Sequence, residues 1–138
     1  MLEVVMLPVA DIDRAKEFYA GTLGFPVDHD TRIPGGPEFV QLTPPGSGCS
    51  IVLSRGMADM APGTQRGVQL VVADIRAAHA YLRERGVECG EVVVYGPQGP
   101  RPATEDETGT TLDNVGFVNF TDPDGNAWAV QQISARGA

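Results

Sequence analysis

Apolar and polar positions alternate at the start of the chain and then change to a helical spacing. Residues 5–9 alternate between apolar and less apolar side chains, which predicts a half-buried strand. Over residues 12–19 the apolar positions recur every three or four residues, which predicts a helix with one apolar face. Asp11 stands where its carboxylate can cap the helix, and Gly24 suits the left-handed residue that ends one. The first segment is therefore a strand followed by a capped helix.

The same strand and helix pattern occurs a second time. Val9-Ala10-Asp11-Ile12 recurs as Val72-Ala73-Asp74-Ile75, at a separation of 63 residues from Asp11 to Asp74. The similarity continues downstream until each helix meets a glycine, Gly24 in one copy and Gly86 in the other. A repeat found once indicates a duplicated supersecondary unit, because a solenoid needs at least three copies.

Three shorter strand-like runs follow each predicted helix. They lie around Pro26–Arg32, Glu38–Thr43 and Cys49–Ser54 in the first copy, and around Glu88–Tyr95, Val115–Thr121 and Ala127–Ile133 in the second. Each half is therefore βαβββ, and the fold class is α+β, a single domain of two tandem modules (about 1–56 and 67–138) linked by Met57–Arg66. Gly96–Asn114 is the longest irregular segment, and it is either a mobile lid or a long exposed loop.

Composition restricts the partners of this 138-residue chain. Its net charge of −8 disfavours nucleic acid and anionic membranes, because phosphate binding needs clustered Lys and Arg. The apolar N-terminus has no basic region before it and is typical of a strand rather than of a signal peptide, so we expect the protein in the cytoplasm. Cys49 and Cys89 are too few for a disulfide scaffold, and we expect reduced thiols.

Three segments carry a resemblance to a known family. They are Leu7–Ala15 with Phe18-Tyr19, then Leu23-Gly24-Phe25, and finally Phe120-Thr121-Asp122-Pro123-Asp124-Gly125-Asn126. In these segments the chain resembles the vicinal-oxygen-chelate superfamily of glyoxalases, bleomycin-resistance proteins and ring-cleaving dioxygenases. The resemblance implies that the two βαβββ modules form an open, eight-stranded, cup-like sheet, and that the protein is a homodimer. It does not define the chemistry, because this fold hosts unrelated reactions.

The residues at the family's metal-ligand positions differ from those of metal-using members. Carried over from the resemblance, the first-strand positions fall on Val4 and Gly67, or on Val5 and Val68 after a one-residue slip. The last-strand positions fall on Ala129 and on either Ile51 or Val52. None of these side chains offers the nitrogen, thiolate or carboxylate that a divalent cation requires, so we expect no metal and no other cofactor. His29, between Asp28 and Asp30, offers at most a weak adventitious site, and His79 is expected to be an ordinary helix histidine.

Strand alternation predicts which side chains face the inside of the cup. The predicted ligand-binding set is largely apolar and aromatic, with several neutral amides: Met6, Phe39, Gln41, Gln69, Val71, Tyr95, Phe117, Asn119 and Gln131. Such a lining suits an uncharged or planar organic ligand, and Tyr95, beside the long irregular segment, is placed to cover it. The alternative is that Met6, Phe39 and Phe117 simply fill a closed core.

These features favour metal-independent binding of a small, largely apolar or aromatic molecule such as an antibiotic. The second hypothesis is an enzyme of the same fold, a lyase, isomerase or dioxygenase with an unusual or absent metal site. Binding without turnover is favoured, because no nucleophile constellation is visible in the sequence. A structural dimer or an accessory domain with a fully packed cup is the third hypothesis.

Overall fold

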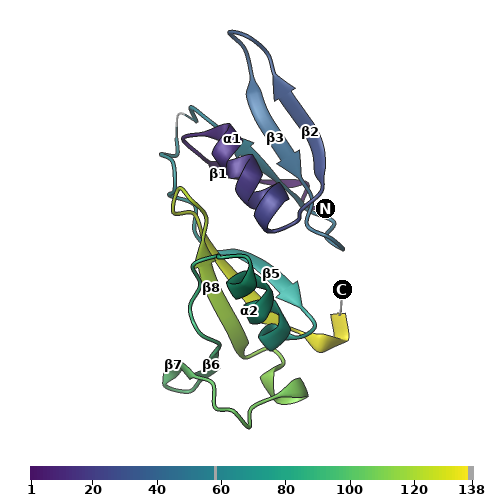
Figure 1. The fold of residues 1–138 in the computed structure, drawn as a ribbon, viewed down its shortest axis with the longest axis vertical. Coiled ribbons are helices and arrows are strands. Elements are labelled where there is room, and N and C mark those ends of the chain that lie inside the picture. Colours follow the sequence, from purple (N-terminus) through teal and green to yellow (C-terminus); the bar gives the residue numbers. More distant parts are fainter. Residues whose placement is uncertain (58, 137–138) are drawn as a thin grey trace. The chain divides into compact units, whose positions relative to one another are not determined.

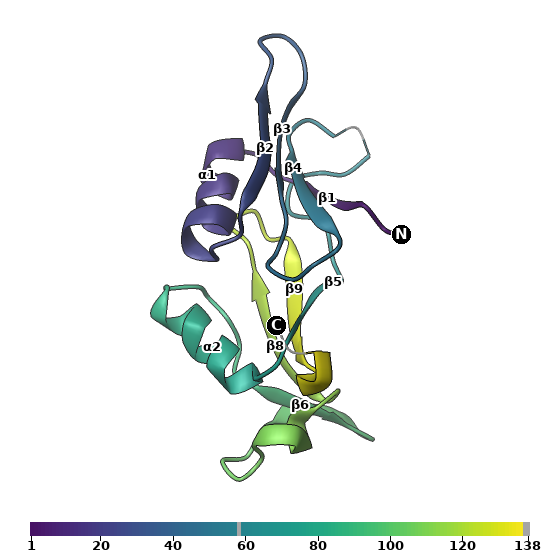
Figure 2. The same cartoon turned by 90° about the vertical axis from the view of Figure 1, so that its right-hand side faces the viewer.

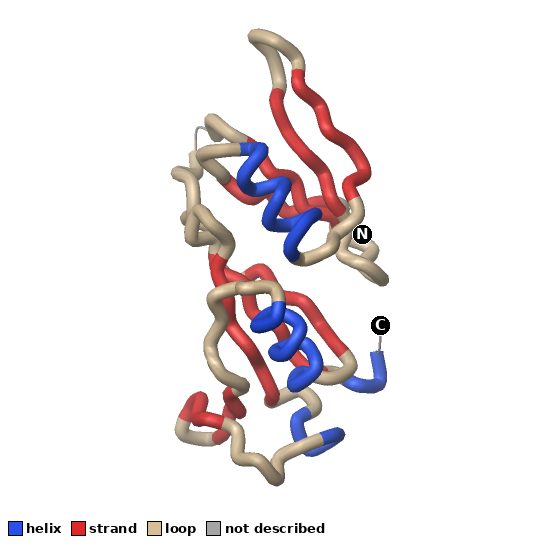
Figure 3. Tube along the Cα trace, in the orientation of Figure 1, coloured by secondary structure: helices blue, strands red, loops and turns tan. Residues whose placement is uncertain are grey.

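The strands of each half of the chain form a small sheet. The computed structural model describes residues 1–57 and 59–136. They form two units: the first comprises residues 1–66 and 122–127, and the second comprises residues 67–121 and 128 onward (Figure 1). Each unit combines helix and strand (Figure 3), so the predicted α+β class and the two βαβββ modules are confirmed.

The first unit contains one sheet and one helix. Its elements are β1 (Val4–Pro8), α1 (Ile12–Lys16) with the π-helical turn Glu17–Thr22, β2 (Val27–Arg32), β3 (Glu38–Leu42) and β4 (Ser50–Ser54). The strand order is β1-β4-β3-β2, in which β1 runs parallel to β4 and the other pairs are antiparallel. This is the order expected for a strand and helix followed by a three-stranded meander.

The first helix changes its pitch where a regular α-helix was predicted. Asp11 caps it by accepting a hydrogen bond from the backbone N–H of Arg14 at 3.0 Å. From Glu17 the chain widens into a π turn, in which the Leu23 N–H donates to the Phe18 carbonyl at 2.9 Å. Gly24 then takes a φ of 83°, the left-handed conformation expected at the end of the helix.

The second unit repeats the strand order and adds one strand. Its elements are β5 (Val68–Val72), α2 (Ile75–Glu84), β6 (Val93–Gly96), β7 (Gly99–Pro102), the 3₁₀ turn Gly109–Leu112, β8 (Gly116–Thr121), β9 (Ala127–Gln132) and the 3₁₀ turn Ser134–Arg136. The order β5-β9-β8-β6 matches β1-β4-β3-β2, and β7 extends the sheet beyond β6. Asp74 caps α2 with two hydrogen bonds, from Arg76 N and Ala77 N at 3.0 and 3.1 Å.

Two sequence predictions need correction in this unit. The strand expected around Glu88–Tyr95 is interrupted, because Cys89 makes only an isolated bridge to Phe120 and β6 begins at Val93. The segment Gly96–Asn114, expected to be irregular, contains β7 and a 3₁₀ turn. Two prolines hide β7 in the sequence, but an edge strand tolerates proline because one of its sides has no strand to pair with.

In each unit the helix covers one face of the sheet. In the first unit Leu7, Val40 and Leu53 are fully buried, and in the second unit Val118 and Trp128 are 0% and 3% exposed. Figure 2 shows α2 lying along one side of β8 and β9. Because successive side chains of a strand point to opposite faces, the neighbouring residues lie on the face away from the helix.

Candidate functional site

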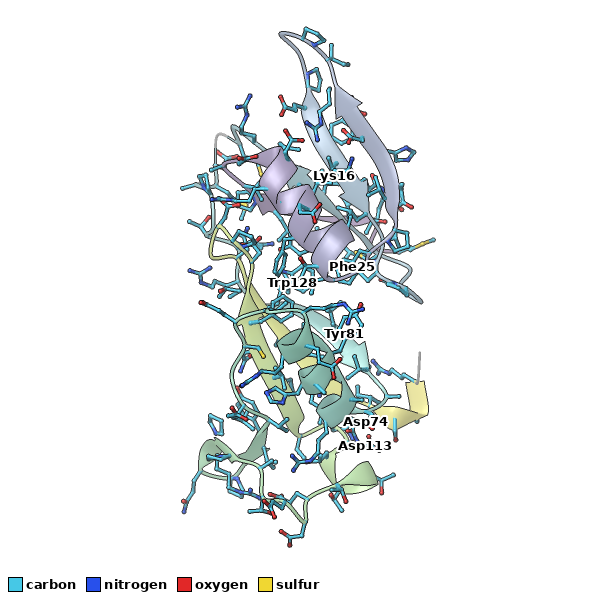
Figure 4. The ribbon with its side chains drawn as sticks, viewed as in Figure 1. Lys16, Phe25, Asp74, Tyr81, Asp113 and Trp128 are labelled. Carbon is cyan, nitrogen blue, oxygen red and sulfur yellow. The ribbon has the colours of Figure 1, made fainter. Side chains whose placement is uncertain are left out.

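The sheet face of the second unit that turns away from α2 carries most of the predicted ligand-binding residues. On β8, Val118 is 0% exposed and Phe120 4%, whereas Phe117 is half-buried and Asn119 is exposed. On β9, Trp128 (labelled in Figure 4) is buried, whereas Ala129 is half-buried. We call this surface the open face, and it comprises Gln69, Val71, Val93, Tyr95, Phe117, Asn119, Ala129 and Gln131.

The strand register fixes which of these residues are neighbours. Gln69 lies opposite Ala129, and Val71 lies opposite Gln131. The Phe120 and Trp128 rings stack with centroids 5.7 Å apart, and Asp122 N donates to the Asn126 carbonyl at 3.0 Å. These two contacts define the register of the hairpin formed by β8 and β9. In this register Asn119 lies opposite Ala129, and Phe117 lies opposite Gln131. The open face therefore has a row in which two amides, Gln69 and Asn119, flank the methyl group of Ala129.

The glutamines of the open face are joined by a chain of hydrogen bonds. Gln69 Nε2 donates to Gln131 Oε1 at 2.7 Å, and Gln131 Nε2 donates to the backbone carbonyl of Asn114 at 2.8 Å. Asn114 is itself fixed, because its N–H donates to the Gln132 carbonyl at 2.8 Å and its φ is 69°. The two side-chain amides are therefore held in a defined direction along the sheet.

Aromatic side chains lie beside the amide row. The rings of Tyr95 and Phe117 meet edge to face, with centroids 5.0 Å apart and an interplanar angle of 75°. Tyr95 remains 45% exposed, and Pro100 of β7 pairs with it across the hairpin. The β6–β7 turn, residues 96–101, lines a hollow of about 350 Å³. The added strand thus extends the apolar surface around Tyr95.

The segment that follows β7 is anchored by two arginines. Arg101 makes a bidentate ion pair with Glu107, with nitrogen-to-oxygen distances of 2.6 and 2.8 Å. Arg76 of α2 donates to the backbone carbonyls of Thr104 at 2.7 Å and of Glu107 at 2.9 Å. The hydrogen bonds from Arg101, and then those from Thr104, lower the pKa of Glu107 from 4.5 to about 2.

A second anchor holds the end of this segment. The carboxylate of Asp113, labelled in Figure 4, accepts hydrogen bonds from Ser134 Oγ at 2.6 Å and Ser134 N at 2.8 Å. Gln132 Nε2 adds a third at 3.0 Å. These donors, Ser134 first, lower the pKa of the Asp113 carboxyl. The segment Gly96–Asn114 is therefore held by polar contacts of Arg101 with Glu107 and of Asp113 with Ser134.

The other three predicted residues lie in the first unit. Met6 and Gln41 both pair with Val52, and Phe39 pairs with Ser54. All three predicted side chains are half-buried on the face away from α1. This unit also contains a cavity of about 160 Å³ outside the predicted set, lined by Pro8, Ala10, Ser54, Met57, Met60 and Pro62 among others.

The donor set does not fit the metal that the family resemblance implies. Met6 pairs with Val52 as Gln69, 63 residues later, pairs with Ala129, so Val52 rather than Ile51 is the equivalent of Ala129. Hydrocarbon side chains at these positions supply no ligand atom. Across residues 1–57 and 59–136, no group of three or more His, Cys, Asp or Glu side chains is gathered as a metal ion would require.

The acidic neighbours of the two histidines are not gathered into a metal site within the described residues. Asp30, next to His29, is held by Lys16 at 2.7 Å and by Arg32 at 2.6 Å, so its carboxylate is already paired. His79 Nε2 lies 3.8 Å from Glu91 Oε2, on the helix that covers the opposite face of the sheet. His79 therefore does not lie on the open face.

Sequence reasoning missed two parts of the open face. The Asn114 carbonyl is a backbone atom and leaves no signal in the residue pattern. Strand alternation predicted that Ala129 faces the inside of the cup, but its place between two amides depends on the pairing of β9 with its neighbours and was not predicted.

Comparison with known proteins places this geometry in a family. The profile of the Glyoxalase/Bleomycin resistance protein/Dioxygenase superfamily matches residues 2–130. The chain is 32% identical to TnmS3, an antibiotic binding protein from Streptomyces sp. CB03234, over 97% of this chain and 96% of that one, with a TM-score of 0.74. A glyoxalase/bleomycin resistance protein from the same organism is also 32% identical, over 96% of this chain and all of that one, with a TM-score of 0.72.

A third similar structure comes from Sphaerobacter thermophilus DSM 20745. This member of the Glyoxalase/bleomycin resistance protein/dioxygenase superfamily is 27% identical over 96% of each chain, with a TM-score of 0.74. A comparison with curated protein sequences gave no match. None of the helices in the described residues has the length and apolar character to cross a membrane. The chain belongs to the Glyoxalase/Bleomycin resistance protein/Dioxygenase superfamily.

Proposed function

We propose that this protein binds a small, largely apolar or aromatic organic molecule, such as an antibiotic, on the open face of the second unit and without a metal ion. The observation that carries the proposal is the exposed surface on which an edge-to-face pair of aromatic rings stands beside three side-chain amides. Similarity to an antibiotic binding protein at 32% identity over nearly the whole chain supports it.

The chemistry of the open face selects a neutral ligand. Its residues include no charged side chain, so an ion placed there would lose hydration without gaining a counter-charge. The net charge of −8 further disfavours anions. Apolar contacts with Val71, Phe117 and Tyr95 supply affinity, and the amides of Gln69, Asn119 and Gln131 supply orientation.

The donor set supports metal independence. Val52 and Ala129 occupy equivalent places on the last strands of the two units, and neither side chain can replace a water on a cation. In this proposal, contact with the sheet therefore holds the ligand. Elemental analysis of freshly purified protein tests this part, and one tightly bound metal ion per chain would contradict it.

Ligand binding is tested by the change in Tm with a panel of neutral aromatic compounds, followed by calorimetric titration of those that raise it. Ala129→Leu fills the space between Gln69 and Asn119 and is expected to weaken binding by roughly tenfold or more. Ala80→Leu, the same substitution at an exposed position of α2, is the matched control and should leave the affinity unchanged. A panel without any binder, or equal affinities in the two variants, would overturn the proposal.

We further propose that the protein is cytoplasmic and forms a homodimer, the assembly that the family resemblance implies. In this extension of the proposal, the first-unit residues Met6, Phe39 and Gln41 contribute further apolar and amide contacts to a ligand. Light scattering on the purified protein measures the assembly, and a monomer at micromolar concentration would refute the dimer.

A further inference from the structure

The hydrogen-bond chain on the open face has a fixed direction. A backbone carbonyl only accepts, so Gln131 must turn its Nε2 toward Asn114 O, at 2.8 Å. Its Oε1 is thereby left for Gln69, which must donate with Nε2, at 2.7 Å. The orientation of both amides is therefore set by a backbone atom on the connection that leads into β8.

This direction determines what Gln69 presents outward. A primary amide has two N–H donors and an oxygen with two acceptor sites. Gln69 uses one N–H on Gln131; within the described residues no protein group bonds its other N–H or its Oε1, and the residue is exposed. Donation to Gln131 also polarises the amide, which makes Oε1 a better acceptor. Gln69 thus offers a donor and a strengthened acceptor side by side.

We propose that Gln69 determines specificity by selecting neutral planar ligands that carry an N–H next to a C=O, the edge found in lactams and imides. Such an edge pairs with both free sites of the Gln69 amide, its N–H to Oε1 and its C=O to the N–H. The inference rests on the proposed function, because it assigns the ligand class of the same open face. An ester or a ketone meets only one of the two sites, and a carboxylate confronts Oε1 with a second negative oxygen.

The surroundings of Gln69 have room for a ring. Ala129 lies between Gln69 and Asn119, and two strand spacings put the backbones of these amides about 10 Å apart. The small Ala129 methyl leaves a flat surface between them. Phe117 and Tyr95 place aromatic rings beside this surface, at the next set of paired positions along the strands. A ring lying on Ala129 therefore places its edge against Gln69 and its apolar body toward the aromatic pair.

The test compares isocarbostyril, a planar lactam, with its N-methyl derivative, which lacks the N–H, and with naphthalene. Affinities are measured by NMR titration of the full chain. Wild-type protein is expected to bind isocarbostyril roughly tenfold more tightly than the N-methyl compound, the effect of one well-made hydrogen bond. Gln69→Met keeps the length of the side chain and removes the amide, so the preference should disappear while naphthalene binding persists.

Two further variants make the outcome unambiguous. Gln131→Met removes the group that aligns Gln69 and should reduce the lactam preference. Gln65→Met makes the same exchange in the first unit and should keep the full preference. Equal binding of the lactam and its N-methyl derivative by wild-type protein, or a preference that survives in Gln69→Met, overturns the inference but leaves the proposed function intact. If wild-type protein binds none of the three compounds, the proposed function fails, and the inference fails with it.

Discussion

The two units share one strand order and carry different chemistry at equivalent positions. Met6 in the first unit corresponds to Gln69 in the second, and Val52 corresponds to Ala129. The thioether of Met6 and the isopropyl group of Val52 form an apolar surface. The amide of Gln69 and the methyl group of Ala129 instead form a surface with a polar group beside a small side chain. Duplication of the module thus preserved the backbone while the side chains diverged, which is why fold alone does not define the ligand.

The units also differ in how their outer strands are held. In the first unit, ion pairs attach β2 to α1: Lys16 to Asp30 at 2.7 Å and Arg32 to Asp13 at 3.0 Å. In the second unit, β6 is instead paired with the added β7, and Arg76 and Arg101 fix the following segment. These charged groups anchor the outer segments, whereas the open face carries no charged side chain.

The largest contrast in stability is expected at the turns before the last strands. Asp122 is 4% exposed and accepts hydrogen bonds from Tyr19 Oη at 2.7 Å, Asn126 Nδ2 at 2.8 Å and three backbone N–H groups at 2.9 Å. Asp122→Ala leaves these donors buried without an acceptor and should lower the free energy of unfolding by about 3–5 kcal/mol. Urea denaturation measures the loss.

The corresponding turn before β4 supplies the control. Ser47 has only local bonds to Cys49, in an exposed loop, so Ser47→Ala should cost less than about 1 kcal/mol. Similar losses for the two variants would show that the turns carry equal weight, contrary to the contrast drawn from their contacts.

A smaller difference in the free energy of unfolding is expected between substitutions of Arg55 and Gln132. These residues follow the equivalent positions Val52 and Ala129 by three residues. Gln132 is 2% exposed, accepts from Ile75 N at 3.0 Å and donates to the Gly109 carbonyl at 2.8 Å, so it joins the start of α2 to the 3₁₀ turn. Gln132→Leu should destabilise the protein by about 2–3 kcal/mol, because both backbone partners lose their hydrogen bond.

Arg55 is the matched position in the first unit. Its side chain is 59% exposed and lies 3.5 Å from Glu38, a weak surface ion pair. Arg55→Leu should therefore change the free energy of unfolding by less than about 0.5 kcal/mol in the same urea experiment. A large effect of Arg55→Leu with none from Gln132→Leu would reverse the comparison.

The two helix-capping residues, Asp11 and Asp74, should differ less in their contribution to the free energy of unfolding. Asp74 accepts two backbone N–H groups, whereas Asp11 accepts one. Replacement of either residue by Ala should cost about 1 kcal/mol, with the larger loss at Asp74. Thermal unfolding of the two variants in parallel gives the order, and a larger loss for Asp11→Ala would contradict the hydrogen-bond difference.

The helix caps and the buried faces of the strands could be predicted from the sequence, because both depend on residues that are close together in the chain. Asp11 and Asp74 were predicted as caps because a carboxylate before an apolar periodic run has one obvious use. The faces of β8 and β9 followed from alternation, since one side of each strand is buried by α2.

The features that sequence reasoning missed depend on distant contacts or on backbone atoms. The strand β7 was hidden by Pro100 and Pro102, which only an edge position accommodates. The π turn after Lys16 contains Tyr19, whose hydroxyl bonds to Asp122, a residue far along the chain. The orientation of Gln69 depends on the Asn114 carbonyl, and no residue pattern encodes a carbonyl direction.

The smallest expected effect, and the sharpest test of how the two units anchor their outer segments, is in acid titration. The pKa of Glu107 is lowered from 4.5 to about 2, chiefly by Arg101, so the ion pair contributes stability above pH 4.5 and loses it as the pH falls toward 2. The protection factor of the Thr104 amide, whose N–H donates to Glu107 at 2.9 Å, should fall across this interval. Glu107→Gln should remove this pH dependence.

In the first unit Lys16 likewise lowers the pKa of Asp30, so protection of β2 should also weaken in acid, and Asp30→Asn should abolish that change alone. If Glu107→Gln abolished both transitions, the two anchors would be coupled, whereas separate contacts within each unit predict that they titrate independently.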